Sequence, residues 1–362
     1  MILGQNMENS IYKLSRQDII HLKGYQSARM IGDQGHVWLN ANESPYEFIF
    51  NIKNLKYNRY PEFQPKKLIE KYSIYSNTSI ENILVSRGSD EAIELLIRVF
   101  CRYKKDYIII CPPTYAMYSK ISEIYGIHNI FIPMFKNCSL NVKKIKLFSL
   151  NSKLIYICRP NNPTGHIIDV LDIIDILEYT SRTTIVVIDE AYIEFCINDN
   201  LIYLLKQYHN LVILRTLSKA FGLAGIRCGF AVANVKIIKL LKKVITPYPL
   251  PVPSIYIANK ALNKKGILRM QSQVKLLNNN KSWLIKEINK ISFVEYVYPS
   301  STNYILVQFK SSDYVFRKLL DQGIVLRDQS HIKGLLNCIR ISIGSYEECV
   351  YLINALRSIS SC

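Results

Sequence analysis

A lysine flanked by hydroxyl residues and an arginine is the strongest chemical signal in this sequence. Lys219 follows an apolar run at residues 211–214, and Thr216, Ser218 and Arg227 lie close to it in the chain. A lysine just after a strand lies at the carboxyl edge of its sheet, where open α/β folds bind ligands. Hydroxyl and guanidinium groups bind phosphate oxygens. The pattern predicts a lysine that forms a Schiff base with a phosphorylated carbonyl cofactor, with a plain surface lysine as the alternative.

An acidic residue and an amide follow two other apolar runs. Asp189 comes directly after residues 184–188, a β-branched run. A carboxylate at the end of a buried strand is desolvated, so it needs a cation or hydrogen-bond donors. A pyridinium nitrogen would supply that cation, and a helix cap is the alternative. Asn162 lies in a turn fixed by prolines and a glycine, so we expect its amide to donate to a phenolate oxygen unless this is an ordinary loop.

Polar and aromatic residues also mark the start of a helix and two proline turns. Ser89 and Asp90 begin a predicted helix that ends near residue 100. Free N–H groups at a helix start bind anions, although either residue also suits a simple helix cap. Tyr115 follows a Pro-Pro pair and can stack on a flat ring. Tyr60 lies in a similar Tyr-Pro turn.

Two arginines accompany apolar strands near the end of the chain. Arg327 follows a predicted strand at residues 324–326, and Arg340 lies inside another at residues 338–343. An arginine among buried apolar residues is costly unless it is paired. The two residues therefore suggest anion clamps for a substrate, and a structural ion pair is the alternative.

The order of apolar runs predicts an α/β protein with two domains. Strand-like runs alternate with helical patterns from about residue 41 to 250, which favours a mainly parallel sheet between helices. Four prolines at 247–253 then mark a boundary. We expect a large domain over residues 41–255 and a smaller α+β domain over residues 256–362 that includes a bridging helix. Residues 1–40 are expected to form an N-terminal arm that contributes to the small domain.

Composition limits the classes of function. Apolar residues make up 49% of the 362 residues and charged residues 20%, which excludes a disordered chain. The apolar stretches are far shorter than the ~20 residues of a membrane-spanning helix, so no membrane partner is expected. The net charge is +18, but the basic residues are scattered, which favours small anionic substrates over nucleic acid. Nine cysteines without a C-x-x-C pair indicate free thiols in a reducing cytoplasm, and the six histidines show no metal-ligand spacing.

In their order and spacing, these motifs resemble the fold-type I aminotransferases that depend on pyridoxal phosphate (PLP). The resemblance runs from residues 39–45 (Leu-Asn-Ala-Asn-Glu-Ser-Pro) to residues 337–344 (Asn-Cys-Ile-Arg-Ile-Ser-Ile-Gly). It implies that Lys219 binds PLP covalently and acts as the catalytic base. Around the cofactor, it places Asp189 at the pyridine nitrogen, Asn162 and Tyr192 at the phenolic oxygen, and Tyr115 on the ring. The cofactor phosphate would be held by Ser89, Asp90, Thr216, Ser218 and Arg227, together with Tyr60 from the partner subunit. For the substrates, it places Arg340 at the α-carboxylate of glutamate, and Arg327 and Tyr25 at the substrate's phosphate or distal carboxylate.

Within that family, the resemblance is strongest to the branch that acts on L-histidinol phosphate. It implies amino transfer between L-histidinol phosphate and 2-oxoglutarate, giving imidazole acetol phosphate and L-glutamate, in histidine biosynthesis. It also implies a homodimer with shared sites. A threonine-phosphate decarboxylase, another aminotransferase or an aminotransferase-like DNA-binding regulator are the alternatives, although residues 1–40 are too short for the helix-turn-helix domain of the last. Arg159 stands where the family has a small or polar residue, so we expect an added cation near the site.

Overall fold

The computed structural model describes residues 12, 14–24, 35–52 and 55–359. Within these residues, seven strands form a central sheet in which every neighbouring pair is parallel except those that include β8. This arrangement confirms the predicted α/β fold with a mainly parallel sheet. In spatial order the strands are β2 (Ile83–Ser86), β8 (Gly229–Ala233), β7 (Leu211–Thr216), β6 (Ile185–Asp189), β5 (Ser152–Cys158), β3 (Tyr107–Ile110) and β4 (His128–Phe131).

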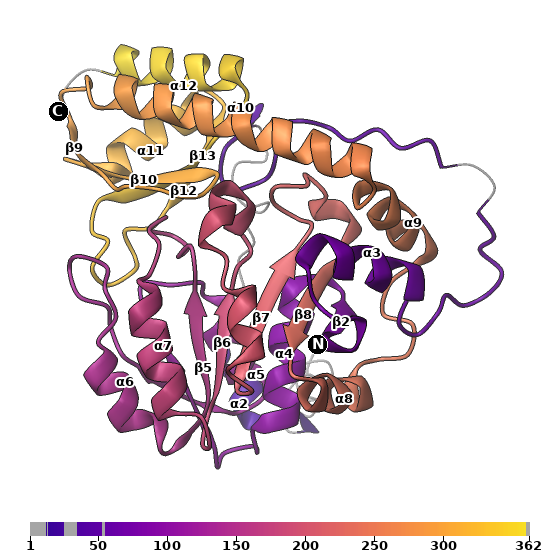
Figure 1. The fold of residues 1–362 in the computed structure, drawn as a ribbon. Coiled ribbons are helices and arrows are strands. Elements are labelled where there is room, and N and C mark those ends of the chain that lie inside the picture. The colour runs from indigo at the N-terminus through magenta and orange to yellow at the C-terminus, as the bar shows by residue number, and fades with distance from the viewer. Residues whose placement is uncertain (1–11, 13, 25–34, 53–54, 360–362) are drawn as a thin grey trace, which may run out of the picture.

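Helices cover both faces of this sheet, because alternate strand residues point to opposite sides (Figure 1). Val187 and Leu214 pack with the helices of one face, and Ile188 and Ile213 pack with those of the other. Both sets are buried and apolar, as expected for parallel strands covered on two sides. The first face carries α4 (Gly88–Phe100), α5 (Met117–Ile124) and α8 (Val235–Val244), and the second carries α6 (Val142–Ser149) and α7 (Val170–Tyr179).

A second, antiparallel sheet is built from the last third of the chain. Its described strands are, in spatial order, β12 (Arg327–Asp328), β13 (Cys338–Ser342), β10 (Tyr304–Phe309) and β9 (Val294–Val297). Helices α10 (Lys264–Ile288) and α11 (Ser312–Asp321) pack against it, and α12 (Tyr346–Ser358) packs against both of these helices. Helix α10 runs from α9 (Val252–Ala261), beside the central sheet, to this second sheet (Figure 1).

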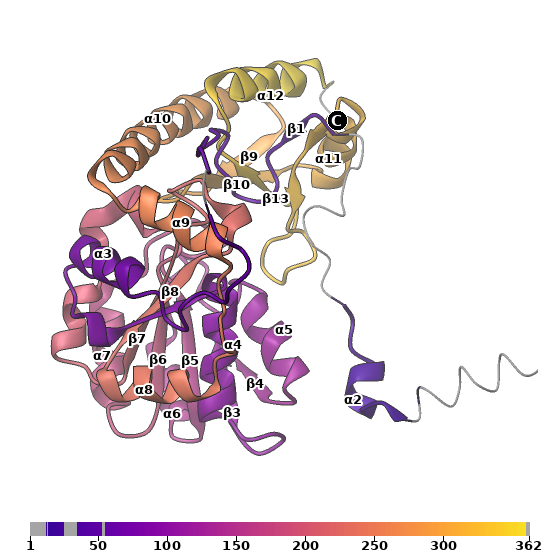
Figure 2. The same ribbon diagram turned by 90° about the vertical axis from the view of Figure 1, so that its right-hand side faces the viewer.

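Residues 37–39 lie beside the second sheet, where they form a separate two-stranded sheet. Strand β1 (Val37–Trp38) pairs in parallel with β11 (Ile324–Val325), and Figure 2 shows it beside α11 and β13. The Leu39 amide donates to the Val325 carbonyl, and the Ser342 amide donates to the Leu39 carbonyl. The segment that follows, residues 40–43, is thereby held between the two sheets. The remaining described helices are α2 (Gln17–Ile20), α3 (Lys66–Ser76) and the short 3₁₀ helices η2 (Ile80–Asn82), η3 (Ile193–Asp199), η4 (Ile202–Lys206) and η5 (Ala224–Ile226).

The helix lengths also bear on the membrane prediction. Among the described residues, every helix is too short or too polar to cross a bilayer. The longest described helix, α10, carries polar residues along its whole length, including Asn278, Asn279 and Asn280.

Candidate active site

A cavity of about 270 Å³ lies where the carboxyl ends of the central strands face β12 and β13. Open parallel sheets bind ligands at this edge, because polar residues that follow neighbouring strands converge there. Most of the residues predicted for the site line this cavity. They are Ser89, Asp90, Tyr115, Asn162, Asp189, Tyr192, Thr216, Ser218, Lys219, Arg227, Arg327 and Arg340.

Lys219 lines the cavity and comes shortly after the end of β7. Its Nζ donates to the carbonyl oxygen of Ala41, 3.1 Å away, in the segment held between the two sheets. The pKa of Lys219 is lowered to about 8, mainly by burial and in part by the nearby Arg340 guanidinium, while Glu43 acts in the opposite direction. A lysine with such a pKa holds a substantial neutral fraction near neutral pH, which is the form that acts as a nucleophile or base.

Asp189 is the last residue of β6 and is almost completely buried. Its Oδ2 accepts a hydrogen bond from the Tyr118 hydroxyl at 2.8 Å, and its Oδ1 accepts one from the Ala191 amide at 3.1 Å. Burial raises the pKa of Asp189 to about 6, although both hydrogen bonds oppose the shift. A buried carboxylate of this kind favours a cationic partner in the cavity.

One group of lining residues is suited to bind a phosphate group. It combines the N-terminus of α4 with Thr216, Ser218 and Arg227. The Thr216 hydroxyl donates to the Ser218 Oγ at 2.9 Å and the Ser218 amide donates to the Thr216 Oγ1 at 3.1 Å, so both side chains are fixed. A Cβ on Gly88 would come within 2.7 Å of an Arg227 nitrogen, so glycine leaves room for this guanidinium.

Asp90 and Tyr115 form a contact next to this group. The Tyr115 hydroxyl donates to Asp90 Oδ1 at 3.0 Å, and Arg227 Nη2 lies 3.4 Å from Asp90 Oδ2. A carboxylate repels a phosphate, so this geometry gives Asp90 the task of orienting its two neighbours.

A third group of side chains joins the central sheet to the second sheet. Asn162 Oδ1 accepts a hydrogen bond from Arg340 Nη1 at 2.8 Å, and Asn162 Nδ2 donates to the Tyr192 hydroxyl at 3.4 Å. Asn42 Nδ2 donates to the same hydroxyl at 3.0 Å. Arg340 Nη2 donates to the Asn40 carbonyl at 2.7 Å. Residues from three distant parts of the chain therefore fix one another at the cavity wall.

The two arginines of the second sheet lie side by side. Arg327 on β12 is the direct cross-strand partner of Arg340 on β13, and both line the cavity. Adjacent guanidinium groups repel each other, so their pairing here favours anionic ligands. Gln329, His331 and Ile332, which the sequence analysis did not name, also line the cavity, as do Asn42 and Glu43, which it quoted only within residues 39–45.

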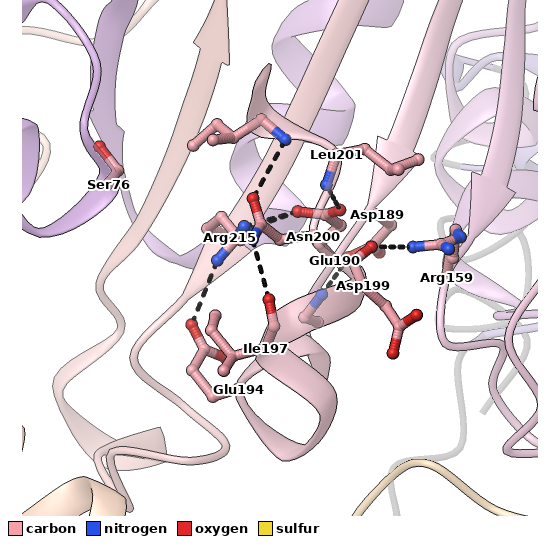
Figure 3. A network of polar contacts seen from close by, with 12 residues as sticks. Ser76, Arg159, Asp189, Glu190, Glu194, Ile197, Asp199, Asn200, Leu201 and Arg215 are labelled. Atoms are coloured by element: carbon pink, nitrogen blue, oxygen red, sulfur yellow. Dashed lines mark hydrogen bonds and ion pairs between the residues drawn. The ribbon is translucent and has the colours of Figure 1, made fainter. Parts of the chain in front are cut away.

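Two predicted residues, Tyr60 and Arg159, do not line the cavity of this chain, and Tyr25 lies outside the described residues. Tyr60 is 82% exposed and stacks on Tyr248 with ring centroids 4.5 Å apart, and its predicted role lies in a partner subunit. The expectation that Arg159 adds a cation near the site is wrong: its Nε donates to the Ile168 carbonyl at 2.8 Å, and its Nη1 donates to the Asp199 carbonyl in the layer behind the site (Figure 3).

Comparison with known proteins identifies the family. The aminotransferase class I and II family matches residues 32–356. The histidinol-phosphate aminotransferase of Blochmanniella floridana is 51% identical over 96% of this chain and 97% of its own length. The enzyme of the same name from Escherichia coli O9:H4 (strain HS) is 49% identical over 96% and 98%.

Solved structures share the fold. The histidinol-phosphate aminotransferase of Sinorhizobium meliloti in complex with pyridoxal-5'-phosphate has a TM-score of 0.84, is 21% identical and covers 96% of this chain and 98% of its own. An L-threonine-O-3-phosphate decarboxylase from Porphyromonas gingivalis has a TM-score of 0.72, is 24% identical and covers 83% and 90%. At these identities, the structures show the fold alone. Together with the sequence relatives, the comparisons show that the chain belongs to the PLP-dependent aminotransferases of class I and II, among the histidinol-phosphate aminotransferases.

Proposed function

We propose that this enzyme transfers the amino group between L-histidinol phosphate and 2-oxoglutarate, giving imidazole acetol phosphate and L-glutamate, a step of histidine biosynthesis. The observation that carries the proposal is one cavity in which Lys219 lies among a buried carboxylate, a phosphate-suited helix start and two paired arginines. Close relatives that carry the name histidinol-phosphate aminotransferase support the choice of substrate.

The described side chains fit PLP at each of its functional groups. Asp189 would hold the ring nitrogen, because a buried carboxylate favours a protonated partner. Thr216, Ser218, Arg227 and the N-terminus of α4 would hold the phosphate. Lys219 would bond to the cofactor through its amine nitrogen. When bound, PLP supplies an electron sink that stabilises negative charge at the substrate carbon that loses a proton.

The protein's own part in the chemistry is to move one proton and to hold two anionic substrates. Lys219, with a pKa of about 8, is suited to remove the substrate's Cα proton as a neutral amine and to return it to the cofactor side. Asn162 and Tyr192 would contact the phenolic oxygen of the cofactor, and the Asn42 amide keeps the Tyr192 hydroxyl in place. Tyr115 would lie against the ring, fixed by its hydrogen bond to Asp90.

One site must accept both an imidazolyl phosphate and a dicarboxylate. Arg340 would bind the α-carboxylate of glutamate, and Arg327 would bind either the substrate's phosphate or the distal carboxylate. A guanidinium fork binds both anions through paired N–H donors, which is why a single residue serves both substrates.

The proposal extends to a homodimer in the cytoplasm. Tyr60 is exposed on its own chain, as expected of a residue that reaches a partner's phosphate site. For the substrate, we propose that Tyr25 binds the phosphate or the distal carboxylate together with Arg327. The eight cysteines within the described residues carry free thiols, in keeping with a reducing compartment.

We also propose that the chain is divided into an arm (residues 1–40), a large domain (41–255) and a small domain (256–362). The pairing of β1 with β11 supports the proposal that the arm contributes to the small domain.

Absorption spectra test the proposed reaction. Adding L-histidinol phosphate to the PLP-loaded enzyme, without an acceptor, should convert the bound cofactor stoichiometrically to its amine form, and 2-oxoglutarate should restore the starting spectrum. L-threonine phosphate should release no CO₂. Release of CO₂ without amino transfer would instead identify a decarboxylase, to which the chain is far less similar in sequence than to the aminotransferases.

A further inference from the structure

A buried ionic cluster, drawn in Figure 3, lies on the face of the central sheet opposite to the side chains of Asp189 and Thr216. The guanidinium of Arg215 donates from Nε and Nη2 to the same Glu190 oxygen, at 2.8 and 2.7 Å. Arg215 is 4% exposed and Glu190 is fully buried. Charged groups are rarely buried to this degree, and their pairing has to offset a large desolvation cost.

The position of this pair in the sheet relates it to the site. Glu190 directly follows Asp189, and Arg215 directly precedes Thr216. Asp189 pairs with Leu214 across the parallel strands β6 and β7, so Glu190 and Arg215 come next in the same register. Because strand side chains alternate, Asp189 and Thr216 face α4 and α5, whereas Glu190 and Arg215 face the opposite side.

Further contacts fasten the cluster to its surroundings. The other Glu190 oxygen accepts a hydrogen bond from the Leu201 amide at 2.7 Å. Arg215 Nη1 lies 3.5 Å from Glu194 Oε1, which also accepts from the Tyr75 hydroxyl at 3.4 Å. Burial raises the pKa of Glu194, and the Arg215 charge opposes that shift. The close contacts therefore belong to Glu190, and Glu194 is the weaker of the two acidic partners.

We propose that Glu190 and Arg215 are positioning residues for the cofactor, a role that rests on the proposed function. Their pair joins the ends of β6 and β7 at the very positions next to Asp189 and Thr216. It thereby fixes the separation between the carboxylate assigned to the ring nitrogen and the hydroxyl assigned to the phosphate. The ring nitrogen and the phosphate of a rigid cofactor are a fixed distance apart, so the groups that bind them must be held at a matching separation. A small error in that separation weakens binding strongly.

A charge-free variant separates positioning from stability. The triple variant is Glu190→Gln/Glu194→Gln/Arg215→Met. The glutamine at position 190 keeps an oxygen that accepts from the Leu201 amide, and the glutamine at position 194 keeps one that accepts from the Tyr75 hydroxyl. Buried ion pairs replaced together in this way commonly leave stability unchanged or improved, because no lone charge remains. The single variant Glu194→Gln is the matched control, since it removes a neighbouring charge and leaves the Glu190–Arg215 pair intact.

Two readouts are measured, the thermal midpoint of the PLP-free protein and the dissociation constant of PLP from the visible absorption of the bound cofactor. We expect the triple variant to keep a thermal midpoint close to that of the parent but to bind PLP at least about tenfold more weakly. Glu194→Gln should bind PLP as the parent does. Equal PLP affinity in the triple variant and the parent overturns the inference.

Two further outcomes are also decisive. If the triple variant does not fold, Arg215→Lys takes its place, because it keeps the positive charge and loses the planar fork that reaches Glu190 twice. PLP affinity at the parent level in this folded variant would then overturn the inference. Failure of the parent itself to bind PLP would instead reject the proposed function, so the two failures are distinguishable.

Discussion

Two ionisable residues in the cavity shift their pKa in opposite directions for the same reason. Burial disfavours the charged form of each, so the pKa of Asp189 rises to about 6 and that of Lys219 falls to about 8. The apo-protein therefore holds a poorly solvated anion and a poorly solvated cation in one site. Both conditions favour a ligand that brings a cation to Asp189 and takes the amine of Lys219 into a bond.

Replacing Lys219 tests the proton transfer. Lys219→Ala should lower kcat by at least about 10⁴-fold, because general acid–base catalysis by a positioned group is lost, while PLP still binds through the phosphate end. Lys281→Met is the matched control. Lys281 is also buried, donates to the Thr302 carbonyl at 2.8 Å and has a pKa lowered to about 8, but it lies on α10 outside the cavity lining. The steady-state rate of transamination is measured for both variants. Near-normal turnover in Lys219→Ala would show that Lys219 is not the base that moves the proton.

Replacing Asp189 tests the energetic cost of the buried carboxylate. Its pKa is 3.8 when solvated and about 6 in the fold, so between these values the unfolded chain loses the proton first and stability falls as pH rises. Asp189→Asn has no such loss. Relative to the parent, the PLP-free variant should gain up to about 3 kcal/mol in free energy of unfolding between pH 4 and pH 7. Urea unfolding at both pH values measures the gain, and a pH-independent difference would contradict the shift.

Residue types at strand ends predicted much of the site, and tertiary contacts explain what was missed. Lys219, Asp189 and Asn162 each follow an apolar run, so their convergence at one edge followed from the strand pattern. Asn42 and Tyr118 belong to no such pattern. Tyr118 lies on α5, which packs against β3 and β4, and its ring stacks on Tyr156 of β5 so that its hydroxyl reaches Asp189 at the end of β6; a single sequence does not reveal that contact.

At the scale of elements, the approach of β8 to the start of α4 shapes the phosphate end. A Cβ on Gly229 would lie 2.5 Å from the Gly88 carbonyl carbon, which is backbone and cannot rotate away. Glycine at this position therefore allows the strand and the helix start to touch. Strand β8 was not predicted, because its sequence, Gly-Phe-Ala-Val-Ala, is rich in small residues with weak strand preference.

A methyl group at Gly229 tests this approach. Gly229→Ala should destabilise the protein by about 1–3 kcal/mol, because the helix start must shift, and it should weaken PLP binding through the phosphate. Gly225→Ala is the control, since a Cβ there has open space around it. Denaturant unfolding and PLP titration give the two quantities, and wild-type values for Gly229→Ala would show that the contact is not needed.

The boundaries of the elements were predicted best where apolar residues recur regularly. The helix predicted to begin at Ser89 and Asp90 and to end near residue 100 is α4, which spans Gly88–Phe100. Asp189 instead proved to be the last residue of β6 rather than the residue after it, because the sheet's hydrogen bonding continues to Cys158 on β5. The direction of β8 is set by its pairing with β2 and β7, which local pattern alone does not specify.

At the scale of the whole molecule, the proposed homodimer makes Tyr60 part of another subunit's site. The parent should sediment at twice the mass of one chain, and Tyr60→Phe should weaken PLP binding about tenfold through loss of a hydrogen bond to a charged group. Tyr57→Phe, at another exposed tyrosine in the same loop region, is the control. A monomeric parent, or equal PLP affinity in both variants, would contradict shared sites.

The hydrogen bonds between residues 37–42 and the last third of the chain have a consequence for folding during translation. On the ribosome, Asn40 emerges early, but its partner Arg340 is synthesised about 300 residues later, after roughly 15–60 s of translation. Until then, β1 has no strand to pair with and the cavity lacks a wall. A nascent chain therefore lacks the arginines assigned to the substrate's anions until translation is almost finished, whereas every residue assigned to the vitamin B6 cofactor has been synthesised by residue 227.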